Sequence, residues 1–246
     1  MPTRPVKMFL TLYKKEMREL AVEITAIISI VAVSALLFYL NYNTSNPRIL
    51  AVPFILAAGL IGLVPLISSL RLISKEWTNN TIYLIMSLPV KGSMILGSKF
   101  LALITEYIAG TGAVLLAGSL LFIGLVPEAI QKIQIYSEII PWEIGVYAYL
   151  STIVILAYFL SISFFSQMMA KLIQKFRWLV AVVSFLTTWW LSDKLIGELG
   201  AGYVYMLNHI DQIEMGTLGV TTIAYMLAAL LIFLLAVLIY NRKVEL

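Results

Sequence analysis

The sequence predicts an all-α membrane protein with six transmembrane helices. Three observations support this fold class: the composition, six long apolar stretches and the distribution of basic residues. The 246 residues are 61% hydrophobic and only 12% charged, whereas about a quarter of the residues in soluble domains are charged. This composition excludes a disordered chain, a coiled coil and a nucleic-acid-binding domain.

Six stretches have the length and apolarity of membrane spans. A helix needs about 20 mostly apolar residues to cross a hydrocarbon layer about 30 Å thick. Because backbone groups cannot stay unpaired in lipid, these stretches must be helical. The expected spans run roughly from Ala21 to Leu40, Leu50 to Leu72, Phe100 to Leu125, Ile144 to Ala170, Trp178 to Ile196 and Leu218 to Tyr240.

The basic residues indicate the orientation of these spans. Of the 17 lysines and arginines, all but Arg48, Lys132 and Lys194 fall in one set of alternating segments, which includes both ends of the chain. Basic residues are enriched in cytoplasmic loops. We therefore expect a multi-pass protein of the plasma membrane with both termini in the cytoplasm.

Residues 1–20 precede the first span and are expected to lie on the inner membrane surface. From residue 5 onward, one helical stripe is apolar and the opposite side is cationic; the stripe contains Val6, Phe9, Leu10, Tyr13, Met17 and Leu20. This pattern is typical of a helix lying on an anionic leaflet. The alternative is that the segment is only the basic flank of the first span.

The second cytoplasmic loop, residues 71–99, contains a short helical segment. Its apolar run, Ile82 to Leu88, ends at Pro89, which cannot continue a helix. Ile82 and Met86 lie opposite the stripe that can face the membrane, which favours a docking surface for a soluble partner. The alternative is a surface loop with scattered apolar residues.

The same loop carries a resemblance to a known family. The run Glu76-Trp77-Thr78-Asn79-Asn80-Thr81-Ile82-Tyr83-Leu84-Ile85-Met86-Ser87-Leu88-Pro89-Val90, followed by Ile95-Leu96-Gly97-Ser98-Lys99, resembles the signature between spans two and three of type-two ATP-binding-cassette (ABC) exporter permeases. Lys15-Glu16-Met17-Arg18 resembles the N-terminal elbow helix of that family. Asn80 stands where the family usually has glycine, and asparagine tolerates a left-handed backbone comparatively well.

The resemblance implies a coupling helix that contacts a separate ATPase subunit. The residues expected to make this contact are Glu76, Trp77, Thr78, Asn79, Asn80, Thr81, Ile82 and Met86. A second contact is expected in the loop from residue 171 to 177, at Lys171, Gln174 and Lys175. Two ATPase subunits would bind ATP and Mg, and two permease copies, identical or closely related, would pair above them.

Residues 192–218 are expected to form broken or re-entrant helices at the outer face. Charges interrupt the fifth span after Leu191, and three glycines follow: Gly197, Gly200 and Gly202. Irregular backbone at membrane depth is tolerated only where protein or water covers it. The family resemblance implies that this segment is an external gate.

The chain shows no catalytic motif of its own. It has one histidine and no cysteine, which argues against a multi-histidine or thiolate metal site. The run from Gly92 to Lys99 resembles a phosphate-binding loop, but Ser98 separates the second glycine from the lysine. We therefore expect no cofactor in this chain and ATP hydrolysis in a partner subunit.

Glu106 is the only carboxylate well inside an expected span. Such a group costs roughly 2.5–3.5 kcal/mol at the bilayer centre. Glu106, Gly110, Ala113 and Ala117 fall on one helical face, and small residues at this spacing allow close helix packing. Glu106 should therefore face protein or a water-filled cavity, either on a transport path, as a hydrogen-bonding lock between spans or as a protonated carboxyl.

These observations favour a single permease domain over residues 1–246, acting as the transmembrane subunit of an ABC exporter. The expected substrate is amphipathic or hydrophobic: a peptide, a drug or a lipid. The expected partners are the ATPase subunits, a second permease copy and the lipid bilayer, without nucleic acid. The alternatives are a non-transporting membrane scaffold or immunity-type protein and, with weaker support, an intramembrane enzyme.

Overall fold

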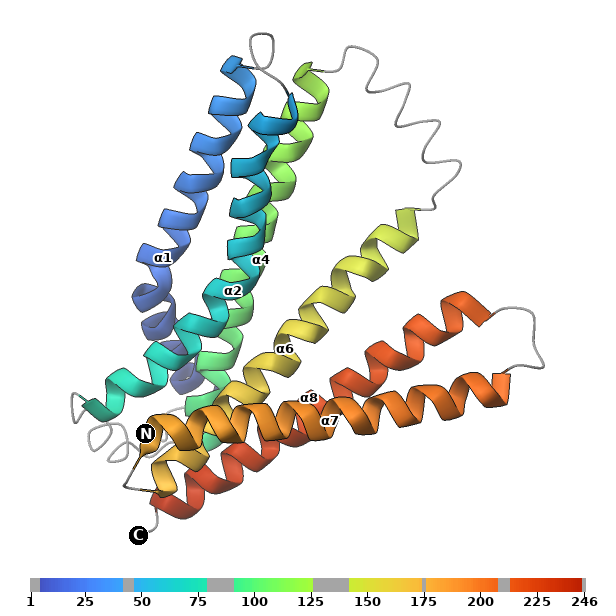
Figure 1. The fold of residues 1–246 in the computed structure, drawn as a ribbon. Coiled ribbons are helices and arrows are strands. Elements are labelled where there is room, and N and C mark those ends of the chain that lie inside the picture. Colours follow the sequence, from blue (N-terminus) through green and yellow to red (C-terminus); the bar gives the residue numbers. More distant parts are fainter. Residues whose placement is uncertain are drawn as a thin grey trace. The chain divides into compact units, whose positions relative to one another are not determined.

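The structure is a computed structural model. It describes the backbone of residues 5–41, 47–78, 91–125, 142–173, 176–207 and 213–244, and the side chains over most of these ranges. These residues are helical apart from short connecting positions, and no strand occurs among them. The helices are α1 (Pro5–Asn41), α2 (Pro47–Thr78), α4 (Gly92–Leu125), α6 (Trp142–Leu172), α7 (Arg177–Leu207) and α8 (Ile213–Val244) (Figure 1).

The predicted all-α fold with six potential membrane spans is confirmed by helix length and composition. Within the described residues, six helices are long and apolar enough to cross a membrane. Their apolar parts are Pro5–Asn41, Ile55–Glu76, Gly92–Leu121, Ile144–Leu172, Arg177–Glu198 and Gly219–Arg242. These features indicate a multi-pass membrane protein.

Several helices extend beyond the expected spans. One helix, α1, covers both the expected surface segment and the first span, and α2 continues past Leu72 to Thr78. The long helix α7 passes without a break through Ser192, Asp193 and Lys194. Apolarity identifies only the part of a helix that suits lipid, whereas the helical hydrogen bonds continue through polar residues. Residues 208–212 of the expected re-entrant segment lie outside the described residues.

The chain forms two compact units, and α2, α4 and α6 each contribute to both. Unit 1 contains residues 1–68 and 101–149, and unit 2 contains residues 69–100 and 150–246. The expectation of one permease domain stays a prediction.

Unit 1 is held by packing among α1, α2 and α4. The buried side chains of its core are Ile27 and Val31 on α1 and Ala57 and Ile61 on α2. Tyr107, Ala113, Val114 and Ala117 on α4 pack against this core. Tyr13 and Thr105 add a hydrogen bond between α1 and α4, with 2.9 Å between their oxygens.

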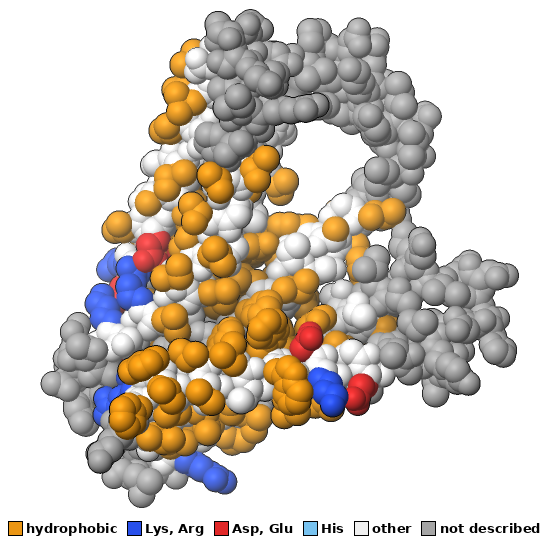
Figure 2. Space-filling model, in the orientation of Figure 1, with side chains coloured by type: hydrophobic (Ala, Val, Ile, Leu, Met, Phe, Trp, Pro, Cys, Tyr) orange, Lys and Arg blue, Asp and Glu red, His pale blue; other side chains and the backbone are white. Residues whose placement is uncertain are grey.

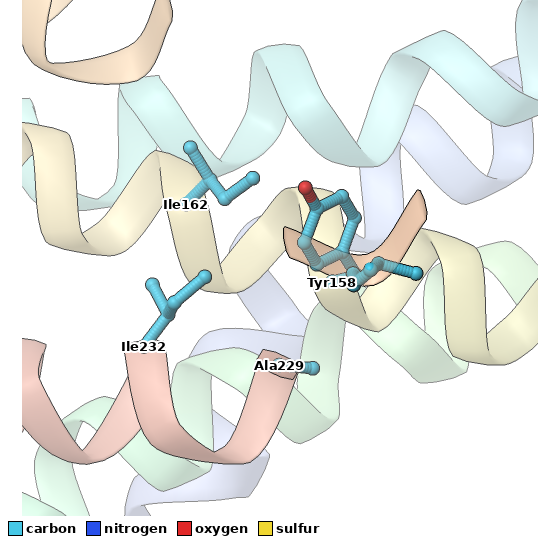
Figure 3. Packing of buried hydrophobic residues seen from close by; sticks show 5 residues of the cluster. Tyr158, Ile162, Ala229 and Ile232 are labelled. Atoms are coloured by element: carbon cyan, nitrogen blue, oxygen red, sulfur yellow. The ribbon is translucent and has the colours of Figure 1, made fainter. Parts of the chain in front are cut away.

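Unit 2 has a core that joins α6, α7 and α8. Tyr158 and Ile162 on α6 lie close to Ala229 and Ile232 on α8 (Figure 3), and Ile196 on α7 belongs to the same cluster. Three aromatic rings form a second contact: Phe100 packs 6.0 Å from Phe164 and 4.9 Å from Phe233, measured between ring centroids. Aromatic pairs at these separations stabilise by about 0.5–1.5 kcal/mol beyond the area that they bury.

On the face that Figure 2 shows, large apolar side chains cover much of the described surface. On α7 the exposed ones include Trp178, Leu179, Val182, Val183, Leu186, Trp189, Trp190, Leu191 and Leu195. A soluble protein rarely exposes so large a contiguous apolar surface. Lipid chains are as apolar as leucine, so this surface suits a bilayer.

Candidate functional site

The segment that resembles a coupling helix lies between the end of α2 and the start of α4. Glu76 is two residues from the end of α2, and Lys99 lies about two turns into α4. The Nζ atom of Lys99 is 2.7 Å from Oε1 of Glu76, and the two side chains are only 2% and 9% exposed. The two helix ends that flank the segment are therefore joined by a buried ion pair within unit 2.

Because this ion pair is buried, its stability depends on the balance between a desolvation cost and a Coulomb attraction. Removing two charges from water costs several kcal/mol for each ion, and the Coulomb attraction offsets this cost only where the geometry is good. A distance of 2.7 Å is at the short end for a charge-assisted hydrogen bond between nitrogen and oxygen. Removing one partner of a buried ion pair costs about 3–5 kcal/mol, because the other charge loses its closest counter-charge.

The end of α8 packs against the same region of unit 2. Gly92 begins α4, and a Cβ atom added there would lie 2.5 Å from a ring carbon of Tyr240 and would also contact the side-chain oxygen of Asn241. A Cβ atom at this position would therefore force the buried Tyr240 ring to move. Tyr240 is 4% exposed, and its hydroxyl makes no hydrogen bond within the described part of the chain.

Only part of the expected ATPase contact is described. Glu76 is buried in the ion pair, while Trp77 and Thr78 form the end of α2 and their side chains are not described. The remaining expected contact residues lie outside the described residues: Asn79, Asn80, Thr81, Ile82 and Met86. The contact with an ATPase subunit stays a prediction.

Gly92 to Lys99 do not form a phosphate-binding loop. The run forms the first turns of α4, and the Lys99 ammonium is paired with Glu76. A phosphate-binding loop instead needs a glycine-rich turn whose amides surround the phosphates. The run is therefore helical here, and the absence of a nucleotide site in this chain stays a prediction.

A second polar cluster surrounds Glu106 in unit 1. Glu106 is fully buried, and the Ser68 hydroxyl on α2 lies 3.4 Å from its Oε1 atom and donates to Oε2 of Glu23 on α1 at 2.7 Å. The prediction that Glu106 faces protein is confirmed. Its neighbour Gly110 is equally close-packed, because an added Cβ would lie 2.9 Å from a methyl carbon of Ile61. Whether Glu106 lies on a transport path stays a prediction.

The expected second contact begins at the end of α6. Lys171 belongs to the last turn of this helix, and Gln174 and Lys175 lie outside the described residues. The next residue, Phe176, has a left-handed backbone with φ of 56° and a side chain that is 70% exposed. Its carbonyl accepts the first helical hydrogen bond of α7, from the amide of Val180 at 3.0 Å.

The three glycines of the expected outer gate all lie within α7. Gly197 has open space around it, since an added Cβ would meet no atom within 4 Å. Gly200 and Gly202 belong to the same continuous helix. Their role in a gate stays a prediction.

Polar pairs in unit 2 were not anticipated from the sequence. The Tyr158 and Ser192 hydroxyls are 2.6 Å apart, and the Tyr225 hydroxyl donates to Asp193 at 3.1 Å. Ser69 and Ser163 form a buried hydrogen bond of 2.7 Å between α2 and α6. No spacing in the sequence predicts these pairs, because each joins residues on two different helices that are 32 to 94 positions apart.

Comparisons with known proteins add no assignment. The chain matches no protein-family model, no curated protein and no solved structure. Among the described residues, no group of three or more histidine, cysteine, aspartate or glutamate side chains is placed to hold a metal ion. The features of the chain that bear on its function are therefore the membrane helices, the region around Glu76 and Lys99, and the resemblance in sequence.

Proposed function

We propose that this chain is the permease subunit of an ABC exporter. The observation that supports this most directly is the position of the segment that resembles a coupling helix. It connects two helices of membrane-spanning length, α2 and α4, as the family layout requires. The excess of basic residues on this side of the spans supports a cytoplasmic position for the segment, where an ATPase could reach it.

In this proposal the energy comes from a separate ATPase. Two ATPase subunits bind ATP and Mg and contact the segment that follows Glu76 in each permease copy, up to residue 88, with residues 171–177 as a smaller contact. Closure of the ATPase pair moves the two coupling segments. This movement tilts the connected helices and opens a route through a pair of permease copies in the plasma membrane.

The remaining parts of the chain have roles that follow from the same layout. The N-terminal part of α1 acts as the elbow helix on the inner surface. Residues 192–218, which include the end of α7 and the start of α8, form the outer gate. The apolar character of the spans suits an amphipathic or hydrophobic substrate, such as a peptide, a drug or a lipid, which moves outward.

The decisive test begins with the partner. The tagged chain, isolated in mild detergent together with proteins from its own cells, should retain a protein whose sequence contains the ATP-binding motifs of an ABC ATPase. The pair, co-expressed and placed in lipid nanodiscs, should hydrolyse ATP faster with substrate than without it. A chain that never binds such an ATPase would contradict the proposal and favour a non-transporting scaffold or immunity-type protein.

Glu106 provides a test of the route. Glu106→Gln keeps the size of the side chain and a hydrogen-bonding group beside Ser68, so assembly should be preserved. A loss of transport in an assembled complex would support a place on the path. Unchanged transport would instead assign Glu106 to a lock between α1, α2 and α4.

A further inference from the structure

We infer that Glu76 and Lys99 form a clamp that makes α2 and α4 move together when the segment between them is displaced. The inference rests on the proposed function only for the source of the displacement. Glu76 is thus a positioning residue inside the permease, and its carboxylate is not offered to an ATPase surface. The clamp is defined as the ion pair between Glu76 on α2 and Lys99 on α4.

The first argument comes from burial. Both side chains are more than nine-tenths buried, and the ion pair is 2.7 Å long. A residue in this position presents almost no surface to a soluble partner. Its carboxylate instead binds Lys99 on the neighbouring helix of the same chain.

The second argument is that stability alone does not explain the ion pair. A well-packed apolar pair of the same volume is often as stable as a buried ion pair, or more stable. What a buried ion pair can add is one preferred arrangement of the two helices, because another register separates these two charges. Here the arrangement that it specifies is the alignment of the end of α2 with the first turns of α4.

The third argument concerns the transmission of movement. When a partner protein displaces a segment, the flanking helices move with it only if the two ends of the segment stay together. Otherwise a local conformational change at one end takes up the displacement. Coupling between distant sites is carried by rigid elements joined through packed or ion-paired contacts. The clamp joins α2 to α4 at the base of residues 77–91, and Gly92 brings the end of α8 against the same base.

The first experiment uses the isolated chain in nanodiscs and needs no partner. The sequence has no cysteine, so spin labels at Leu70→Cys and Lys91→Cys are unique, and pulsed electron spin resonance measures the distance between them. Both positions are exposed. Glu76→Gln and Lys99→Met should each broaden the distance distribution between the two labels. Loss of one partner should shift the equilibrium between the closed clamp, with the two helix ends together, and an open one, with the ends apart, toward the open form by roughly 100-fold or more.

Two double variants distinguish loss of the clamp from misfolding of a single variant. The exchanged pair E76K/K99E should restore the narrow distribution. If the exchanged pair does not fold, E76Q/K99M, which removes both charges, should broaden the distribution less than the two single effects combined. The matched control is Glu19→Gln, which removes the partially exposed pair of Lys15 and Glu19, 3.9 Å apart, and should change nothing.

The second experiment adds the ATPase and measures substrate molecules moved per ATP hydrolysed. The single variants should bind the ATPase with unchanged Kd but move fewer molecules per ATP, and the exchanged pair should recover the ratio. Distance distributions unchanged in the single variants would overturn the clamp. An unchanged ratio despite broadened distributions would overturn its role in coupling. Broadened distributions in a chain that binds no ATPase would retain the clamp and contradict the proposed function alone.

Discussion

Gly110 and Gly112 on α4 provide a matched test of how unit 1 packs. An alanine Cβ at Gly110 would lie 2.9 Å from one carbon of the Ile61 side chain and 3.3 Å from another, whereas at Gly112 it would meet no atom within 4 Å. Ordinary contact begins at 3.4 Å, so Ile61 would have to move by about half an ångström. Ile61 is 2% exposed and β-branched, so few other rotamers are open to it.

The two substitutions should have different effects on the free energy of unfolding. Alanine gains up to about 1 kcal/mol over glycine in a helix. At Gly112 this gain should remain, whereas at Gly110 an overpacking cost of about 1–3 kcal/mol should exceed or cancel it. Gly110→Ala should therefore unfold about 1–3 kcal/mol more easily than Gly112→Ala. For a chain of this size, each kcal/mol corresponds to roughly 2–4 °C in Tm.

Thermal unfolding in a single detergent measures this difference directly. Ile61→Ala removes the carbons that would clash, so it should cost less in the Gly110→Ala background than in the natural chain, by about 1 kcal/mol. A Gly110→Ala variant as stable as Gly112→Ala, or additive effects of the Gly110 and Ile61 changes, would refute the close packing of α4 against α2.

Three further predictions follow from single sites. Phe176→Gly should raise stability by up to about 1 kcal/mol, because the left-handed backbone at φ of 56° strains a side chain that is mostly exposed; a lower Tm would contradict this. Ser68→Ala should lower stability by about 1–3 kcal/mol, because it removes the hydroxyl that donates to Glu23 at 2.7 Å and lies 3.4 Å from the buried Glu106, whereas Ser119→Ala, whose hydroxyl bonds only within its own helix turn in the structure, should be neutral in the same thermal scan. Lys91→Cys should react with a membrane-impermeant thiol reagent only from the cytoplasm and Asp193→Cys only from outside; labelling from the same side would refute the orientation.

Hydropathy predicted the membrane helices because lipid imposes a simple requirement. Each span needs enough apolar residues to match the hydrocarbon thickness, and this requirement is readable from one sequence. It does not predict where a helix ends, since backbone hydrogen bonds continue into polar residues. Thus α2 extends past Leu72 to Thr78, and α7 continues beyond Ile196 to Leu207.

The candidate site was predictable only where a local pattern carries the information. The face containing Glu106 and Gly110 follows from helical spacing, and the structure places both residues inside unit 1. The pair of Glu76 and Lys99 does not follow from spacing, because the fold alone brings these distant positions together. The sequence identified Glu76 as one member of a motif, but its partner and its burial emerge only in three dimensions.

In a membrane-spanning chain, polar pairs between helices determine how the helices pack, and the reason is physical. Apolar side chains gain little from leaving lipid, so helices in a membrane associate through close packing and interhelical hydrogen bonds. The described pairs fit this account: Ser69 with Ser163 at 2.7 Å and Glu76 with Lys99 at 2.7 Å each join two helices within unit 2. Their energies depend on distance and direction, whereas apolar contacts tolerate sliding. The few polar side chains therefore define the register of these helices, and substitutions that change register should concentrate at them rather than at the far more numerous leucines.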